Sequence, residues 1–341
     1  MFFLTIRVIN KSSSPYNMVV VLGIESTAHT IGFSIVKNDD VLSNEKKLFH
    51  TDSGGMIPAQ VADHHINNFE GVLEKAILKA EIKLNEIDYI AYSASPGIGH
   101  SLRIGCFIAK TLAIKLNKPL IPVNHCIAHL EIGRLESGFN DPILLYASGA
   151  NTQVIGFESA RYRVFGETLD VGIGNFLDSL ARELGLGFPG GPKLEELAKK
   201  GSKLLDIPYV VKGMDISLGG ILTFIKNKYI GKESKEDIAF SVQETVFAML
   251  VEVSERALAH TGKKELVIGG GVGCNSRLQG MLSQMCRDRG CKFSSPGKEY
   301  LVDNAAMIAY TGFLNKDIVV DIGDAFIDPY MRTDEVNIGY R

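Results

Sequence analysis

The sequence has few cysteines, little excess charge and no long apolar run near its start. Its five cysteines are odd in number and include no C-x-x-C pair, which argues against a disulfide scaffold and predicts a reducing, cytoplasmic setting. Lysine and arginine total 36 against 39 aspartate and glutamate, a net charge of −3, so a uniformly basic nucleic-acid binder is excluded. The longest clean apolar run near the start, residues 18–24, is far shorter than the roughly 18 residues that span a membrane.

Residues 1–17 lack the small-residue cleavage site of a signal peptide, and we expect no membrane partner. We interpret them as a loosely ordered extension, with Met18 as an alternative start of the protein. The rest of the composition, 45% hydrophobic and 22% charged, is typical of a globular chain with a sizeable core and excludes disorder as the main state. At about 150 residues per domain, 341 residues predict one large or two medium domains.

Strand-like and helix-like segments alternate along the chain. Short β-branched or apolar runs predict strands at 19–24, 32–36, 88–94, 143–147, 154–157 and 265–268. Apolar residues at helical spacing predict helices at 65–80, 101–116, 176–184, 193–200, 236–260, 276–289 and 304–314.

Two of the predicted strand pairs are similar hairpins. A shift of 124 residues places Ile31-Gly32-Phe33 on Ile155-Gly156-Phe157, which predicts a duplicated domain; chance similarity between two glycine-containing hairpins is the alternative. Two such α/β lobes with their hairpin turns facing each other would form a nucleotide cleft. That is the architecture of the actin, sugar-kinase and Hsp70 superfamily.

His125 and His129 are four residues apart, which places both imidazoles on one face of a helix at the spacing of a two-point metal clamp. In a zincin the residue after the first histidine is the glutamate base, but Cys126 stands there, so a metalloprotease is disfavoured. Two unrelated surface histidines are the alternative. Tyr146 and Asp303 are candidates for further ligands, although their spacing alone does not choose them.

Several glycine-rich turns could hold a phosphate. Ser148-Gly-Ala-Asn-Thr152 offers consecutive backbone N–H groups and two hydroxyls, although the same residues form plain turns. The run Gly269-Gly-Gly-Val-Gly-Cys-Asn275 follows a buried strand and opens a helix, which favours an anion, and the alternative for Asn275 is a helix cap. Asp178 and Glu195 lie in early helical turns, where capping competes with a ribose or substrate role.

Taken in order, these motifs resemble the tRNA threonylcarbamoyladenosine transferase family, called TsaD in bacteria and the catalytic subunit of the KEOPS complex in archaea and eukaryotes, formerly O-sialoglycoprotein endopeptidase. The resemblance runs from Val21 to about Phe326 through the segments Leu22–Thr30, Pro122–His129, Tyr146–Gln153, Phe165–Asn175, Gly187–Lys193, Gly269–Leu278 and Asp303–Ala309. It departs from the family at Ala150, where a second glycine is usual, and this puts tight phosphate contact there in doubt.

The resemblance implies an actin-like ATPase (ASKHA) fold of two duplicated, RNase H-like lobes around a nucleotide cleft. It implies one iron or zinc ion per chain, held by positions matching His125, His129, Tyr146 and Asp303. Contacts to an adenine nucleotide (ATP, AMP or threonylcarbamoyl-AMP) fall on Tyr146, Ala147, Ser148, Gly149, Ala150, Asp178, Gly191, Glu195 and Asn275. His29, in the first hairpin turn, is our candidate for the general base, and a solvated turn histidine is the alternative.

The expected domains are an N-terminal extension (1–17), an N-terminal actin-like lobe (18–140), a C-terminal lobe with the nucleotide and metal site (141–315) and a tail (316–341) that packs back on the N-terminal lobe. The implied reaction moves a threonylcarbamoyl group from its adenylate to N6 of adenosine 37, beside the anticodon, in tRNAs that read codons starting with A. The implied partners are tRNA, a kinase-like subunit of the Bud type and a small dimerising subunit. A phosphotransferase or ATPase of the same superfamily is the alternative, and a non-enzymatic scaffold is a further one.

The segment from Lys193 to Lys235 carries nine lysines and five acids, a surplus of four positive charges on a chain whose total is −3. Such a local surplus predicts a docking surface for tRNA or a protein partner. An ordinary solvated face is the alternative.

Overall fold

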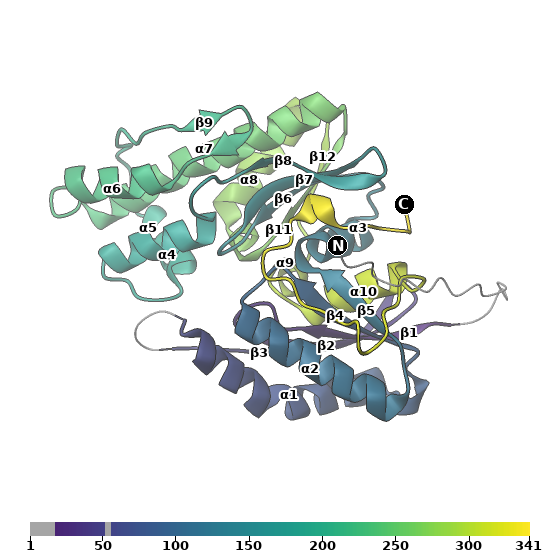
Figure 1. Ribbon diagram of the computed structural model, residues 1–341. Helices are drawn as coiled ribbons and strands as arrows, with labels where there is room; N and C mark the ends of the chain where they lie inside the picture. Colours follow the sequence, from purple (N-terminus) through teal and green to yellow (C-terminus); the bar gives the residue numbers. More distant parts are fainter. Residues whose placement is uncertain (1–17, 52–55) are drawn as a thin grey trace. The chain divides into compact units, whose positions relative to one another are not determined.

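The computed structural model describes residues 18–51 and 56–341, and the expectations for residues 1–17 lie outside this part of the chain. The described residues divide into two units (Figure 1). The first unit is discontinuous and gathers residues 18–50, 56–135 and 303–341. The second consists of residues 136–302 together with residue 51.

A five-stranded mixed sheet forms the centre of the first unit. Its strand order is β3-β2-β1-β4-β5, with β1, β2 and β3 antiparallel and β4 and β5 parallel to β1. The strands are β1 (Val20–Glu25), β2 (Thr30–Lys37), β3 (Asp40–Leu48), β4 (Tyr89–Ser95) and β5 (Leu120–Asn124).

Helices cover both faces of this sheet (Figure 1). On one face α1 (Pro58–Ala80) and α2 (Gly99–Leu116) pack on Leu22, Ile24 and Tyr92, because alternate side chains of a strand point to opposite faces. On the other face α10 (Ala305–Leu314) lies against β1, β2 and β4, and α3 (His125–Ser137) follows β5 directly. The 3₁₀ turns of this unit are Leu84–Glu86 and Thr333–Glu335.

Gly23 permits the close approach of β1 to α10. A Cβ atom at this position would lie 2.5 Å from the Ala305 carbonyl oxygen and 2.5 Å from the Ala309 backbone nitrogen, so any side chain would push the helix away. The expected C-terminal lobe extended to residue 315, whereas α10 belongs to the first unit because it supplies this face of the sheet. In the following segment the Tyr92 hydroxyl donates to the Phe326 carbonyl, 2.9 Å away.

The second unit contains a second five-stranded sheet, ordered β12-β11-β6-β7-β8. Its strands are β6 (Ile143–Ala147), β7 (Thr152–Glu158), β8 (Arg161–Glu167), β11 (Glu265–Gly269) and β12 (Lys292–Ser294). Its helices are α4 (Ile173–Glu183), α5 (Gly190–Ala198), α6 (Gly219–Lys228), α7 (Lys235–Thr261), α8 (Ser276–Asp288) and α9 (Lys298–Leu301). A short ribbon, β9 (Val211–Lys212) with β10 (Asp215–Ile216), and the 3₁₀ turn Gly271–Cys274 complete it.

The two sheets share one topology. Read from β8 to β12, the second sheet repeats the first: two antiparallel pairings are followed by two parallel ones. The predicted duplication therefore holds for strand order, but a uniform shift of 124 residues does not hold for the pairing. Glu25 pairs with Gly32 across six residues, whereas Ala147 pairs with Thr152 across four, so the two hairpin turns differ in length.

Within residues 18–51 and 56–341, no helix combines the length and apolar character needed to cross a membrane. All five cysteines are free thiols.

Candidate functional site

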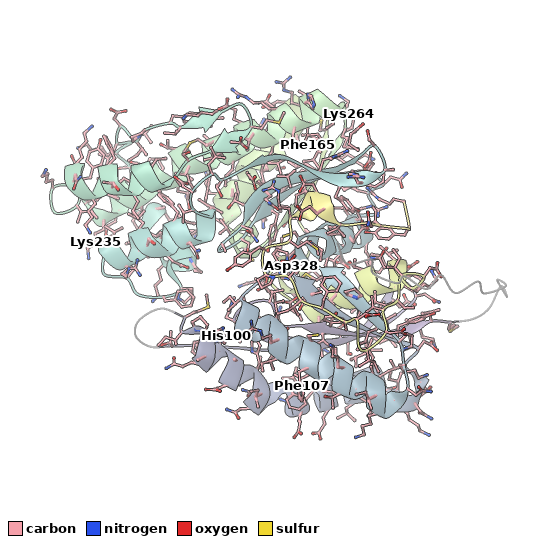
Figure 2. The ribbon with its side chains drawn as sticks, viewed as in Figure 1. His100, Phe107, Phe165, Lys235, Lys264 and Asp328 are labelled. Carbon is pink, nitrogen blue, oxygen red and sulfur yellow. The ribbon has the colours of Figure 1, made fainter. Side chains whose placement is uncertain are left out.

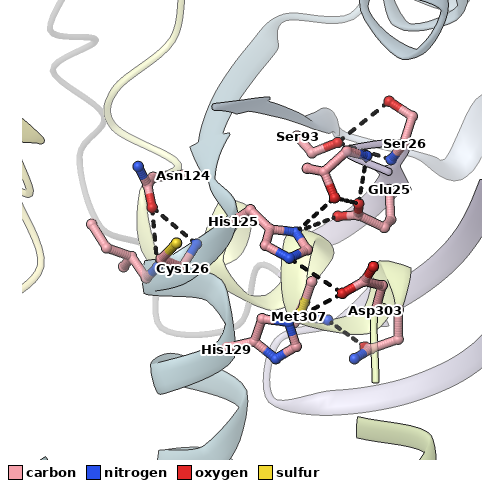
Figure 3. Close-up of polar contacts among 12 residues, drawn as sticks. Glu25, Ser26, Ser93, Asn124, His125, Cys126, His129, Asp303 and Met307 are labelled. Carbon is pink, nitrogen blue, oxygen red and sulfur yellow. Dashed lines mark hydrogen bonds and ion pairs between the residues drawn. The ribbon is translucent and has the colours of Figure 1, made fainter. Parts of the chain in front are cut away.

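Three side chains of the first unit form a candidate metal centre. The Nε2 atoms of His125 and His129 lie 3.3 and 3.5 Å from the same carboxylate oxygen of Asp303 (Figure 3). The three ligand atoms lie within 4.8 Å of one another, and both histidines are buried. The predicted clamp of His125 and His129 is thus joined by Asp303, which the sequence could place only through the resemblance.

Local structure explains why these side chains meet. The Asn124 side chain, at the end of β5, accepts the backbone N–H groups of Cys126 and Ile127 at 3.0 and 3.2 Å, and so caps α3 as it begins. Residues four apart then lie one above the other, and the two imidazole rings are 4.8 Å apart. Asp303 immediately precedes the N-cap of α10, Asn304, which accepts the Met307 N–H.

Electrostatics in the cluster distinguish its members. Burial opposes charge on His125, but the nearby carboxylates of Glu25 and Asp303 outweigh it, so its pKa lies well above the ordinary value. Burial lowers the pKa of His129, and the neighbouring His125 lowers it further. Burial would raise the pKa of Asp303, yet hydrogen bonds and charge from His125 and His129, with a contribution from His29, hold that pKa well below its ordinary range.

The residues present fit a transition-metal ion. At metal–ligand bonds of about 2.0–2.2 Å, neighbouring ligands in a tetrahedral site lie about 3.4 Å apart, close to the two nitrogen–oxygen separations found here. Two imidazoles and one carboxylate suit iron or zinc better than magnesium, which prefers oxygen ligands. Tyr146, the fourth predicted ligand, lies at the end of β6 in the second unit, and its role stays a prediction.

Cys126 occupies the position of a zincin's general base but is unsuited to that role. The side chain is buried, and burial raises the pKa of its thiol to about 11. A thiol that stays protonated near neutral pH cannot accept a proton from water. The cluster of candidate ligands therefore lacks, at position 126, the base of a zinc protease.

Glu25 is a residue of this site that sequence reasoning missed. It is fully buried at the end of β1, and its Oε2 atom lies 3.0 Å from Nδ1 of His125. The available signal was an acidic residue closing an otherwise apolar strand, since a buried carboxylate needs a partner. His29, the predicted base, follows in the same turn and is partly buried.

The predicted nucleotide-binding residues all lie in the second unit, where hydrogen bonds link the elements that carry them. The turn between β6 and β7 contacts the start of α4: Gly174 and Asn175 donate their N–H groups to the carbonyls of Ser148 and Gly149, at 3.0 and 2.9 Å. Ala150, beside them, is exposed. The Thr152 hydroxyl is buried and accepts the Ile173 N–H, so the turn presents fewer hydroxyls than expected.

Two carboxylates continue this chain of contacts. Asp178, on α4, accepts the N–H of Gly190 at the start of α5, 2.7 Å away. Glu195, on α5, accepts the backbone N–H and the hydroxyl of Ser276 at the start of α8. Asp178 thus caps α5 and Glu195 caps α8, and both lie beside helix N-termini, where anions bind favourably.

The glycine-rich loop before α8 carries the last of the predicted nucleotide-binding residues, Asn275. Asn275 caps α8, which was the alternative to a nucleotide contact: its Oδ1 accepts the N–H groups of Arg277 and Leu278, while its Nδ2 donates to Gln243. Gly270 has a φ of 88°. A Cβ there would collide with the Ala147 carbonyl, so only glycine lets this loop pass the end of β6. Gly191, in the first turn of α5, has open space around it.

Comparison with known proteins agrees with the resemblance. The family model of tRNA N6-adenosine threonylcarbamoyltransferase (TsaD) matches residues 40–310. The chain belongs to this family. Its members are transferases by name.

Relatives with this name cover almost the whole chain. The tRNA N6-adenosine threonylcarbamoyltransferase of Thermococcus kodakarensis is 51% identical over 94% of this chain and 99% of its own length. That of Methanocella arvoryzae is 49% identical over 93% and 98%. A probable bifunctional tRNA threonylcarbamoyladenosine biosynthesis protein of Methanocorpusculum labreanum is 49% identical over 94% of this chain but only 61% of its own length.

Solved structures at low identity share the fold. HypF from T. kodakarensis superposes with a TM-score of 0.63 at 16% identity, over 92% of this chain and 50% of HypF, so the chain spans about half the length of that protein. Component A of the Acidaminococcus fermentans (R)-2-hydroxyglutaryl-CoA dehydratase gives a TM-score of 0.54 at 14% identity, over 86% and 98%. With the repeated topology of the two sheets, these likenesses confirm the predicted actin-like ATPase fold.

Proposed function

We propose that this protein transfers the threonylcarbamoyl group from threonylcarbamoyl-AMP to N6 of adenosine 37 in tRNAs that read codons starting with A. The observation that carries the proposal is the 51% identity, over 94% of the chain, to an enzyme named for this transfer. The N6 amine of adenosine is a poor nucleophile, because its lone pair is delocalised into the ring. The acyl group must therefore arrive activated, and the mixed anhydride of an adenylate supplies a good leaving group.

His125, His129 and Asp303 would hold one iron or zinc ion, with Tyr146 as a further ligand. Such an ion, when bound, supplies a positive charge that orients and polarises substrate oxygens. The chain's own contribution is to keep these ligands together in a buried cluster, with Asp303 ionised by its two histidine neighbours. His29 is our candidate for accepting the proton of the N6 amine.

The second unit would bind the adenylate. Helix N-termini and the turns at Ser148–Ala150 and Gly270–Asn275 offer backbone N–H groups, which stabilise phosphate and the negative charge that develops during acyl transfer. Asp178 and Glu195 would hydrogen-bond the ribose hydroxyls. Tyr146, Ala147, Gly191 and Asn275 would line the same site.

We propose that the enzyme works with tRNA and with subunits of a KEOPS-type complex, one kinase-like and one small and dimerising, in the cytoplasm. The relatives named bifunctional support a second protein component, because this chain matches only 61% of one of them. An apolar groove between α1 and α2 supports a protein partner. It is lined by Ile66, Phe69, Ile104, Phe107, Ile108, Thr111 and Leu112, and Phe107 is 69% exposed (Figure 2).

The test is mass spectrometry of tRNA after incubation with the purified protein, its candidate partners and threonylcarbamoyl-AMP. We expect a threonylcarbamoyl group on adenosine 37 of tRNAs for codons starting with A. No product should form with a tRNA carrying guanosine 37, which lacks the amine at that position, or with the His129→Ala variant. Phosphorylation of a small molecule, or ATP hydrolysis, with tRNA left unmodified would favour the phosphotransferase alternative and contradict the proposal.

A further inference from the structure

Glu25 is a fully buried carboxylate beside the candidate metal centre. Its Oε2 atom lies 3.0 Å from Nδ1 of His125, on the side of the ring opposite the Nε2 atom that faces Asp303 (Figure 3). An ionised carboxylate only accepts hydrogen bonds, so Nδ1 must carry the proton in this contact. In the neutral imidazole, which carries this one proton, the lone pair is then on Nε2, the nitrogen that faces the candidate ion.

The second carboxylate oxygen is held by Thr27. Both the backbone N–H of Thr27, 2.7 Å away, and its hydroxyl, 2.5 Å away, donate to Oε1 of Glu25. Three hydrogen bonds thus offset the cost of burying this charge. They also determine the orientation of the carboxylate, because all the donors lie at specific positions around it.

The turn after β1 is itself anchored. The Ser26 N–H donates to the Ser93 hydroxyl at 2.9 Å, and the Ile98 N–H donates to the Thr27 carbonyl at 2.7 Å. These contacts tie the turn to the end of β4 and to the residue that caps α2. The backbone that carries Glu25 and Thr27 is therefore held in place by two neighbouring elements.

We propose that Glu25, held by Thr27, is a positioning residue that fixes the tautomer and the ring orientation of His125 for metal binding. A carboxylate bonded to the far nitrogen of a ligating histidine makes the imidazole more basic and orders it before the ion arrives. The inference rests on the proposed metal site but assigns a role to residues outside the ligand set. Glu25 does not touch the ion or the substrate; it acts through His125.

Glu25→Gln is the informative change, because it keeps the shape of the side chain and removes only the charge and one acceptor. If the amide NH₂ faces Thr27, it replaces the oxygen that accepts the two Thr27 hydrogen bonds, and both are lost. If it faces His125 instead, Nδ1 must accept a hydrogen bond, which moves the ring proton to Nε2 and removes the metal ligand. Either orientation weakens metal binding, and removing the hydrogen-bond partner of a ligating histidine typically costs about 10- to 100-fold in affinity.

The experiment titrates Co²⁺, whose visible absorption reports its coordination, into the metal-free protein in competition with a chelator. We expect one tightly bound Co²⁺ in the wild type and none in His129→Ala. Glu25→Gln should bind about 10- to 100-fold more weakly with a shifted absorption band, and Thr27→Val should show a smaller loss. The matched control is Asp88→Asn, which removes a carboxylate that accepts the Val20 N–H at the other end of β1 and should leave Co²⁺ affinity unchanged.

Far-UV circular dichroism and thermal melts of the metal-free variants accompany the titration. If Glu25→Gln does not fold, Thr27→Val tests Glu25 and Thr27 together, because the Thr27 hydroxyl also lies 3.2 Å from Nδ1 of His125. Wild-type affinity, within twofold, in the folded variants would overturn the role of Glu25 while leaving the metal site intact. A wild-type protein that binds no Co²⁺ or Zn²⁺ would overturn the metal site and this inference together.

Discussion

His65, on α1, is a fully buried histidine outside the ligand set. Burial, helped by the charge of the adjacent His64, lowers its pKa to about 4. In the unfolded chain a histidine titrates near 6.5, so between these two values the unfolded state binds more protons than the folded state. Stability from this residue is therefore complete above about pH 6.5 and is lost as the pH falls towards 4.

We predict that His65→Gln makes the stability of the protein less dependent on pH between about 4 and 6.5. The shift corresponds to about 3 kcal/mol of unfolding free energy across that window. Urea denaturation at a series of pH values measures the slope. The control is His100→Gln, since His100 is an exposed histidine on α2 (Figure 2), and that variant should keep the wild-type slope. Equal slopes in wild type and His65→Gln would contradict the prediction.

At the residue scale, the sequence predicted what local spacing encodes. The pair His125 and His129 follows from four-residue spacing on a helix, and the cap at Asn275, the alternative to its predicted nucleotide contact, follows from its place before α8. Asp303 lies 174 residues beyond His129, and no local pattern connects them, so only the family resemblance placed it in the site. Glu25 was missed because its partner, His125, lies 100 residues away and becomes its neighbour only when the sheet forms.

At the scale of elements, inner and edge strands differed in how well the sequence predicted them. The inner strands β1, β2, β4, β6, β7 and β11 were all predicted, because they are buried on both faces and are rich in apolar residues. The four edge strands β3, β5, β8 and β12 were not. They are partly exposed and polar, like Asp40–Leu48, or contain a proline, like Pro122 in β5, which a sheet tolerates at its edge.

The start of a helix was also harder to predict from the sequence where its residues are exposed. α1 begins at Pro58, seven residues before the predicted start at His65, with proline in its first turn and no side-chain cap. Residues 58–60 are exposed, and although Val61 and Ala62 are buried, the predicted apolar spacing began only at Ile66. Asp178, for which capping was the alternative to a ligand role, caps α5 and not its own helix, because α4 already begins at Ile173.

Variants of Asp178 and Glu195, compared with a control variant, can separate helix capping from contact with a nucleotide. We predict that Asp178→Ala and Glu195→Ala weaken ATP binding and lower stability by about 0.5–2 kcal/mol, since each carboxylate also caps a helix. Asp237→Ala is the control, because Asp237 accepts the N–H groups of Ser202 and Lys203 as a purely structural contact. The Asp237→Ala variant should lose stability and keep its ATP affinity. Calorimetric titration and thermal melts measure both quantities, and unchanged ATP affinity in the first two variants would leave them as caps only.

At the scale of the whole molecule, four of the nine lysines in 193–235 pair with carboxylates, three of which belong to the acids already counted in the surplus. Lys199 pairs with Glu196 at 2.5 Å, and Lys203 pairs with Glu233 at 2.8 Å. Lys226 and Lys228 pair with Glu183 and Asp206. Ion pairs of this kind are typical of an ordinary surface, so a docking role must rest on other lysines of the segment, such as the exposed Lys200 and Lys212.

We predict that Lys200→Glu and Lys212→Glu weaken the binding of every tRNA alike. Removing one lysine–phosphate interaction should lower the slope of log affinity against log salt by about one unit. Filter binding across a salt series measures both effects. Lys115→Glu, an exposed change on α2, is the control and should leave affinity and slope as they are. If all three variants match the wild type, this segment is ordinary surface.

The discontinuity of the first unit has a consequence for the order of events during synthesis. The ribosome releases residues 136–302 before α10, so the continuous second unit can fold while the first sheet still lacks the helix that packs against Gly23. His125 and His129 are made first, and Asp303 follows 174 residues after His129. A nascent chain therefore carries two of these side chains without the third while the 173 residues between His129 and Asp303 are made. Metal loading at a site that needs all three side chains cannot precede the synthesis of Asp303.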